Sequence, residues 1–164
     1  MAEIHEGGCL CGAIRYRVSD KPRGTFVCHC SFCQRASGSA FQIPVYFPRN
    51  CVEFIGGPIS TYEHRFKEHG RALCLQFCAH CSTKVGWTIE RDPELQGICG
   101  GTFDDPNWFD VFAHIFTESS VKWMAFPPGV RCYPKHFITE AGETEKPLPR
   151  QSRPWLMSDV QGNS

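Results

Sequence analysis

The alternation of apolar and polar residues predicts short β-strands along most of the chain. Between residues 13 and 18, apolar side chains alternate with Arg15 and Arg17, which is the period of two expected of a half-buried strand. Other short segments have the composition of strands as well. They cover residues 42–47, 52–55, 61–66, 72–77, 85–89 and 110–116. The pattern therefore predicts a mainly β fold.

Glycine and proline mark the places where these strands end or bend. The Gly-Gly-Pro run at residues 56–58 predicts a turn, and Glu-His-Gly at residues 68–70 predicts a hairpin. Pro44 has no N–H to give to a ladder, so it predicts an edge strand or a bulge. Helical periodicity is weak, and we expect only two short helical turns, at residues 31–36 and 119–125.

The composition changes near residue 140. Residues 5–139 hold the strand pattern, whereas residues 140–164 form a polar, Pro-rich tail. Such a composition favours little regular structure. Trp155 and Leu156 are apolar enough to dock locally. We therefore expect one domain at residues 5–139, followed by this C-terminal tail.

Size and charge narrow the classes of protein. A chain of 164 residues and 18.5 kDa is long enough to bury a core of its own. Its formal net charge is zero, so no strong field draws it to nucleic acid or to an anionic membrane. The first residues lack the basic and apolar regions of a signal peptide, and no apolar run approaches the roughly 20 residues that span a bilayer. We expect a cytoplasmic protein.

Eleven cysteines call for an explanation in a reducing compartment, where disulfides are rare. Their number is odd, and the usual alternative is metal binding. Seven of them gather in three close clusters, each with a spacing that lets neighbouring thiols reach one ion. The clusters are Cys9-Leu10-Cys11, Cys28-His29-Cys30-Ser31-Phe32-Cys33 and Cys78-Ala79-His80-Cys81.

Counting ligands divides the clusters into two sites. Four thiolates complete a closed tetrahedral zinc site, and one C-x-C joined to one C-x-x-C supplies them. The middle cluster then stands alone with three thiols, which leaves the open position typical of a catalytic zinc. The alternative is a single four-cysteine site with spare thiols in the core. The proposed sets are Cys9, Cys11, Cys78 and Cys81 for the closed site, and Cys28, Cys30 and Cys33 for the open one.

The remaining cysteines and the histidines have simpler interpretations. Because His29 lies between two proposed ligands, its side chain should point away from their ion. His80 is expected to be a turn residue, and His114, in an apolar run, a hydrogen-bonded core histidine. We expect packing roles for the isolated cysteines, which are Cys51, Cys74, Cys99 and Cys132.

The joint spacing of the clusters resembles that of the glutathione-dependent formaldehyde-activating enzymes. The matching text begins with Gly-Cys-Leu-Cys-Gly at residues 8–12 and continues with Cys-His-Cys-Ser-Phe-Cys-Gln-Arg at residues 28–35. It then includes Phe-Cys-Ala-His-Cys at residues 77–81 and His-Ile-Phe at residues 114–116. The resemblance covers roughly residues 5–125, and any one cluster alone would be much less specific.

This resemblance implies an antiparallel β fold like that of the Mss4 family, with short helical turns and stabilised by zinc. It also implies two Zn²⁺ per chain, with Cys9, Cys11, Cys78 and Cys81 as structural ligands. Cys28, Cys30 and Cys33 match the catalytic ligands. The implied reaction is a carbon–sulfur lyase reaction in reverse, in which a glutathione-like thiol adds to formaldehyde or a related small aldehyde.

The chemistry of three thiolates fits such a reaction better than hydrolysis. Their negative charge weakens the acidification of water by zinc, while a soft thiol remains a good fourth ligand. Glutathione carries two carboxylates, and Arg35, two residues beyond Cys33, is the first candidate to bind one of them. Two other classes stay open at this point: a zinc-stabilised protein-binding module without catalysis, and a zinc enzyme acting on a different thiol adduct.

Overall fold

The computed structural model describes residues 3–139 and 141–161 of the chain. Those residues belong to two compact units. The first unit comprises Met1–Thr25 and Pro44–Asp110, and the second comprises Phe26–Ile43 and Val111–Ser164. In the part of the chain that the structure describes, no helix is long and apolar enough to cross a bilayer.

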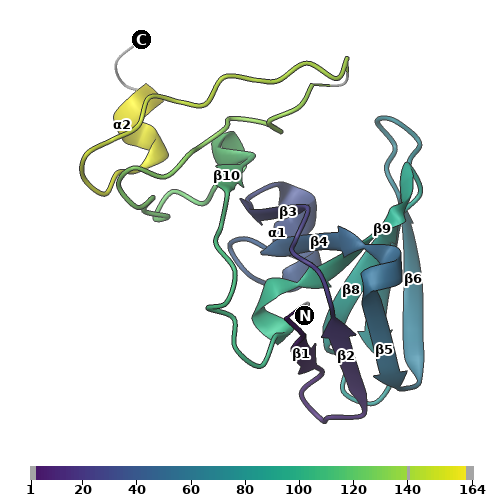
Figure 1. The fold of residues 1–164 in the computed structure, drawn as a ribbon. Coiled ribbons are helices and arrows are strands. Elements are labelled where there is room, and N and C mark those ends of the chain that lie inside the picture. Colours follow the sequence, from purple (N-terminus) through teal and green to yellow (C-terminus); the bar gives the residue numbers. More distant parts are fainter. Residues whose placement is uncertain (1–2, 140, 162–164) are drawn as a thin grey trace. The chain divides into compact units, whose positions relative to one another are not determined.

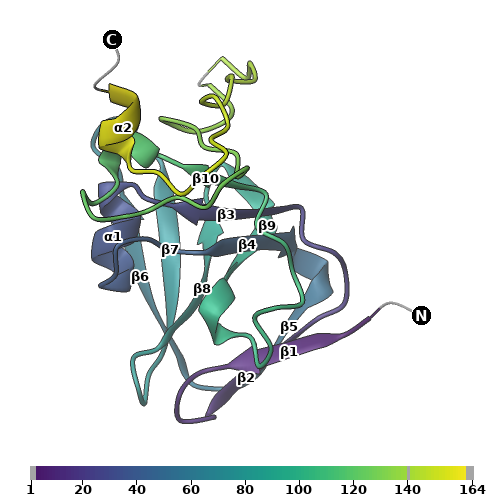
Figure 2. The same ribbon diagram turned by 90° about the vertical axis from the view of Figure 1, so that its left-hand side faces the viewer.

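The first unit is built almost wholly from β-strands. One antiparallel sheet has the order β1-β2-β5, and in another β4, β9, β8, β7 and β6 follow one another, again antiparallel. Figure 2 shows the long strands β6, β7 and β8 side by side. The strands are β1 (His5–Gly8), β2 (Ile14–Val18), β4 (Pro44–Pro48), β5 (Val52–Gly56), β6 (Ile59–Arg65), β7 (Ala72–Cys78), β8 (Lys84–Ile89) and β9 (Asp92–Cys99). Two short 3-10 turns accompany them, η1 (Arg49–Cys51) and η2 (Gly100–Thr102).

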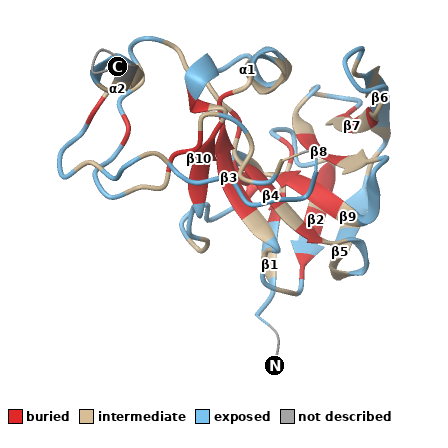
Figure 3. Cartoon of the chain, turned by 90° about the horizontal axis from the view of Figure 1, so that it is seen from above, coloured by how far each residue is buried: buried red, intermediate tan, exposed pale blue. Residues whose placement is uncertain are grey.

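The core of the first unit lies on the inward faces of these strands. Buried residues gather on β2, β4 and β9 (Figure 3). Tyr16 and Phe47 are fully buried and pack their rings against Phe103. A smaller buried group contains Ile14 and Val85 together with two of the clustered cysteines. The thiols of Cys9 and Cys78 are therefore held in place by the packed core around them.

The second unit contains the last three residues of strand β3 (Gly24–Cys28), the helix that follows it, and the chain from Val111 onward. The last three residues of β3 pair in parallel with β10 (Ala113–Ile115), while Gly24 and Thr25 pair with β4. Helix α1 (Ser31–Ser37) follows directly, and η3 (Thr117–Ser119) follows β10. The chain then continues as a long irregular segment to the short helix α2 (Met157–Gln161), drawn from green to yellow in Figure 1.

The C-terminal segment of the second unit has a small core of its own. Phe126, Cys132 and Trp155 are buried together, and Leu148 and Met157 pack against them. Phe126 and Trp155 exchange backbone hydrogen bonds of 2.8 and 3.2 Å. The expected docking of Trp155 is therefore found, whereas the domain boundary at residue 140 stays a prediction. Residues 140 and 162–164 of the predicted tail lie outside the described residues.

The strand pattern predicted most of this architecture. The mainly β fold is confirmed, each of the seven predicted strand segments overlaps an observed strand, and the turn at residues 31–36 is α1. The short helical turn predicted near residues 119–125 is not found there: η3 ends at Ser119, and the Met124 N–H donates to the Val121 carbonyl in a turn outside any helix. The edge position predicted for Pro44 is also wrong, since β4 has neighbours on both sides. Pro44 is its first residue, where a missing N–H is tolerated.

Candidate metal centres

The four cysteines predicted to form a closed site come together in the first unit. Cys9 and Cys11 lie in the turn from β1 to β2, Cys78 ends β7, and Cys81 lies in the turn to β8. All four Sγ atoms lie within 4.8 Å of one another. Cys9 and Cys78 are buried, Cys81 is half-buried and Cys11 is exposed, so the cluster has one face in the core and one toward solvent.

Tight turns give these thiols their directions. The Cys9 N–H donates to the Ile14 carbonyl and the Cys9 carbonyl accepts from Gly12, which closes the first turn at 3.0 and 3.1 Å. Gly12 has a φ of +77°, a left-handed conformation that glycine adopts without strain. In the second turn, the Ser82 N–H donates to the Cys78 carbonyl at 2.8 Å. Each turn thus presents two sulfurs on the same side.

Neighbouring polar groups bind two of the sulfurs. The Ile14 N–H donates to Sγ of Cys9 at 3.2 Å. Oγ1 of Thr83 accepts a hydrogen bond from the Leu10 N–H (3.2 Å) and lies 3.1 Å from Sγ of Cys81, to which its own hydroxyl can donate. These hydrogen bonds from the Thr83 side chain and backbone lower the pKa of the Cys81 thiol to about 5. Thr83, which no sequence motif marks, therefore favours the thiolate form that binds metal.

The spacing of the sulfurs suits a tetrahedral ion. Zinc bound at about 2.3 Å by each thiolate in a regular tetrahedron places the sulfurs about 3.8 Å apart. Sγ of Cys11 lies 3.6 Å from that of Cys9 and 3.7 Å from that of Cys78. The four thiols could therefore hold one metal ion with little movement.

The three remaining clustered cysteines lie together in the second unit. Cys28 ends β3, Cys30 is the N-cap of α1, and Cys33 lies in the first turn of that helix. Their Sγ atoms all lie within 4.8 Å of one another, with 3.6 Å between those of Cys28 and Cys30. The Cys33 N–H donates to Sγ of Cys30 at 3.3 Å, as an N-cap side chain requires. The start of helix α1 thus brings together three thiols that lie within six residues of one another in the sequence.

The ionisation of these thiols indicates a place for a cation. Hydrogen bonds from the Cys28 and Cys33 thiols lower the pKa of Cys30 to about 3. Sharing a proton with Cys30 in turn raises the pKa of Cys28 to about 12, and hydrogen bonding to Cys28 and Cys30 raises that of Cys33. Cys30 thus favours the thiolate form, which is the form that binds a metal cation. The three residues therefore fit a metal ion that takes a further ligand from outside the cluster.

His29 does not add a fourth ligand to this set. Among the described residues, the metal-compatible group here contains the three cysteines alone. The His29 side chain is fully buried, and its Nε2 lies 2.9 Å from Nδ1 of buried His114. Burial, followed by the neighbouring His114, lowers the pKa of His29 to about 4, and burial does the same for His114. Both histidines are therefore neutral core residues, which confirms the core role predicted for His114.

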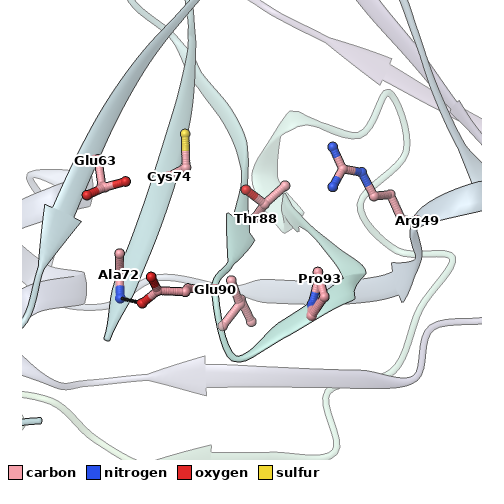
Figure 4. Close-up of a pocket in the computed structure, with 8 residues that line it drawn as sticks. Arg49, Glu63, Ala72, Cys74, Thr88, Glu90 and Pro93 are labelled. Carbon is pink, nitrogen blue, oxygen red and sulfur yellow. Dashed lines mark hydrogen bonds between the residues drawn. The ribbon is translucent and has the colours of Figure 1, made fainter. Parts of the chain in front are cut away.

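The other candidates are more scattered. Arg35 is exposed on α1, where a carboxylate from solution can reach it. Among the isolated cysteines, Cys132 is a core residue of the second unit. Cys74 is half-buried and lines a hollow of about 230 Å³ on the sheet of the first unit (Figure 4). The hollow contains no clustered cysteine, and Glu90, one of its carboxylates, is already bound by Arg65 and by the Ala72 N–H.

Fold and site together define a mainly β protein with two separate cysteine groups, each able to hold a metal ion. The family model of the glutathione-dependent formaldehyde-activating enzymes matches residues 4–119, and the chain belongs to that family. The matched range includes all seven clustered cysteines and ends before the C-terminal core. A crystal structure of a Rhodobacter sphaeroides protein is also similar, with 22% identity and a TM-score of 0.49 over 65% of this chain and 96% of that one.

Proposed function

We propose that the protein binds two zinc ions and catalyses the addition of a glutathione-like thiol to formaldehyde or a related small carbonyl compound. Membership of the family of glutathione-dependent formaldehyde-activating enzymes supports this reaction. The observation that supports a particular site for the reaction is the group of Cys28, Cys30 and Cys33. Their three thiols converge, and the described residues supply no fourth protein ligand.

The two cysteine groups have different roles in this proposal. Cys9, Cys11, Cys78 and Cys81 saturate one zinc ion, which then contributes to folding only. Cys28, Cys30 and Cys33 hold the other and leave one coordination position for substrate. When bound there, zinc would act as a Lewis acid and lower the pKa of a substrate thiol, so that the thiolate can form at neutral pH. Sulfur ligands favour a soft substrate atom, so a thiol is preferred to water.

The reaction needs no oxidant or reductant. A carbon–sulfur bond forms between the substrate sulfur and the carbonyl carbon, while the C=O π bond breaks. The proton that leaves the thiol is balanced by the proton that the carbonyl oxygen gains, giving an S-hydroxymethyl product. This is a carbon–sulfur lyase reaction running toward synthesis. The protein contributes by holding and orienting the thiol.

Arg35 is proposed to bind a carboxylate of the thiol substrate. Arg35 is exposed and lies two residues beyond Cys33, on the same helix. A guanidinium can bind a carboxylate through two parallel hydrogen bonds, which a lysine cannot reproduce. Arg35→Lys should therefore raise KM for glutathione and leave kcat nearly unchanged; an unaltered KM would exclude this role.

Exchange spectroscopy by NMR on mixtures of glutathione and formaldehyde tests the reaction directly. The uncatalysed addition proceeds in water, so the zinc-loaded protein must exceed the exchange rate measured in buffer. Cys33→Ser should return the rate to that background, whereas Cys74→Ser, which changes a cysteine outside both groups, should not. A wild-type rate equal to that of buffer would refute the proposal and favour a zinc-stabilised binding module.

A further inference from the structure

His29 connects the three-cysteine cluster to β10 by both its backbone and its side chain. Its N–H donates to the Ile115 carbonyl at 3.0 Å. Its imidazole Nε2 lies 2.9 Å from Nδ1 of His114, and the two rings stack with centroids 5.2 Å apart and planes 19° from parallel. A residue placed between two clustered cysteines, Cys28 and Cys30, is thus attached twice to the same short strand.

Packing alone does not explain a histidine at this position. His29 has no exposed surface, and its Nδ1 is buried without a hydrogen-bond partner in the described residues. An unpaired buried polar atom costs free energy, which a phenylalanine or leucine in the same space would avoid. The hydrogen bond to His114 is the feature that an apolar side chain could not supply.

The unpaired nitrogen also indicates the direction of this hydrogen bond. If His114 donated from Nδ1, neutral His29 would accept at Nε2 and carry an unpaired N–H at its buried Nδ1. Buried N–H groups without an acceptor are rarer than acceptors with a free lone pair. The tautomer that follows has the proton on Nε2 of His29, which donates to Nδ1 of His114.

Gln34 ties the other side of the cluster to the same part of the chain. Its Nε2 donates to the His29 carbonyl at 2.6 Å and to the Ser119 carbonyl at 2.8 Å. Both N–H groups of one amide thus donate hydrogen bonds. One goes to the segment that carries the three cysteines, residues 28–33 (the cysteine loop), and the other goes to η3. Residues 28–34 are therefore attached to the β10–η3 segment at His114, Ile115 and Ser119.

The C-terminal segment packs against the histidine pair. The Phe126 ring meets the imidazoles of His29 and His114 nearly edge-on, at 5.4 and 5.3 Å between centroids. Trp155 stacks on Phe126 at 4.7 Å and is itself buried. Both aromatic residues lie beyond residue 119, where the family match ends. The C-terminal segment of this chain therefore shields the His29–His114 pair from water.

We propose that the His29–His114 hydrogen bond, kept dry by Phe126 and Trp155, positions the Cys28, Cys30 and Cys33 thiols and so sets how tightly they hold zinc. The inference rests on the zinc binding proposed for these three cysteines, and is independent of the reaction proposed for them. His29 and His114 are positioning residues, since they act through the cysteine loop and touch no substrate.

Zinc release to a chromophoric chelator tests this inference without any assay of activity. The phase of release that disappears in Cys33→Ser belongs to the three-cysteine cluster. In His114→Phe, which keeps a ring and removes the acceptor, that phase should become about tenfold faster, the scale at which groups supporting metal ligands affect affinity. His114→Asn retains an acceptor near the Nδ1 position and should restore most of the wild-type rate.

A matched control separates positioning from loss of stability. Val130 packs against the Phe126–Cys132–Trp155 core, so Val130→Ala should lower the melting temperature and leave the release rate unchanged. If His114→Phe fails to fold, Gln34→Met removes two hydrogen bonds from a half-buried residue and should also accelerate release. The absorption bands of the Co²⁺-substituted cluster should shift in both His114→Phe and Gln34→Met, because thiolate geometry determines them.

Several results would overturn the inference. One is a wild-type release rate in His114→Phe and Gln34→Met; another is equal acceleration in Val130→Ala and His114→Phe at equal loss of melting temperature. A wild-type protein with only one zinc ion would remove its basis. Wild-type protein that binds two zinc ions but does not accelerate the exchange of glutathione and formaldehyde would refute the reaction alone, and the release rates would still decide the role of the histidines.

Discussion

The four-cysteine group of the first unit and the three-cysteine group of the second differ in how much chain each ties together. The first joins the turn at Cys9–Cys11 to the turn at Cys78–Cys81, and 66 residues lie between those turns. The second takes all its thiols from Cys28, Cys30 and Cys33, within six residues. A metal ion in the first closes a long loop and cross-links two hairpins, whereas an ion in the second constrains only a strand end and one helical turn.

In the proposed function, this difference separates a role in folding from a role in chemistry. Cross-linking distant segments removes conformational freedom from the unfolded chain, so a metal ion in the first group would contribute to stability. A local three-ligand set would contribute little in that way and would keep a position for substrate. The supporting groups differ as well: Thr83 and backbone N–H groups serve the first, and a buried histidine pair lies behind the second.

The largest expected effect is loss of the fold when the four-thiol group is broken. Cys78→Ser removes a buried ligand, and structural zinc contributes about 10–16 kcal/mol of apparent binding free energy in small domains. That exceeds or equals the whole stability of a typical domain, about 5–15 kcal/mol, so the melting temperature should fall by more than about 10 °C. Circular dichroism melts measure it. Cys74→Ser, on the same strand, is the matched control and should change the melt little.

Breaking the three-thiol group should affect metal content more than the fold. Cys33→Ser leaves two thiols, which are too few to hold zinc against the chelating capacity of the buffer. Zinc per chain should fall from two to one, thiol–aldehyde exchange should fall to background, and the melting temperature should drop by no more than a few degrees. Metal analysis and melts together decide it. If Cys33→Ser and Cys78→Ser collapse equally, the division of roles is wrong.

The two cysteine groups could be predicted because the cysteines within each cluster lie close together in the sequence. Spacings such as C-x-C and C-x-x-C fix which thiols meet in one turn, and ligand counting then joined Cys9 and Cys11 with Cys78 and Cys81. Strand β9 was missed because it contains Pro93 and Gly97, residues that weaken the pattern of a strand. Gly97 is there because a Cβ would overlap the Trp87 ring, a contact visible only once the strands are paired.

The supporting groups could not be predicted, because they depend on tertiary contacts. Thr83 Oγ1 binds a backbone N–H of Leu10, 73 residues earlier in the chain. Gln34 meets Ser119 across 85 residues. Nothing in the local sequence distinguishes these side chains from ordinary surface threonine or glutamine. The core role of His114 was predictable from its apolar neighbours, but the identity of its partner, His29, was not.

A smaller effect should separate the two ions by their rates of release. A closed four-thiol group has no free position through which a chelator can attack, whereas a three-thiol group has one. We expect two phases of equal amplitude when zinc-loaded protein is mixed with a chelator, one ion in each. The faster phase should disappear in Cys33→Ser. A single phase carrying both ions would mean that the two groups do not differ in accessibility.

The smallest effect concerns Thr83, which supports the four-thiol group alone. Thr83→Val keeps the branched shape but removes the hydroxyl that lies 3.1 Å from Sγ of Cys81 and accepts from the Leu10 N–H. The Leu10 N–H is exposed and can bind water instead, so the net loss is about one hydrogen bond, or about 1 kcal/mol, and the melting temperature should fall by about 2–4 °C. The slow phase of zinc release should quicken, because Cys81 loses the donor that stabilises its thiolate, while the fast phase should not change. Thr61→Val, at an exposed position of β6, is the control and should alter neither phase. An accelerated fast phase in Thr83→Val would contradict the assignment of Thr83 to the four-thiol group, and an unaltered slow phase would mean that its hydroxyl does not support the metal.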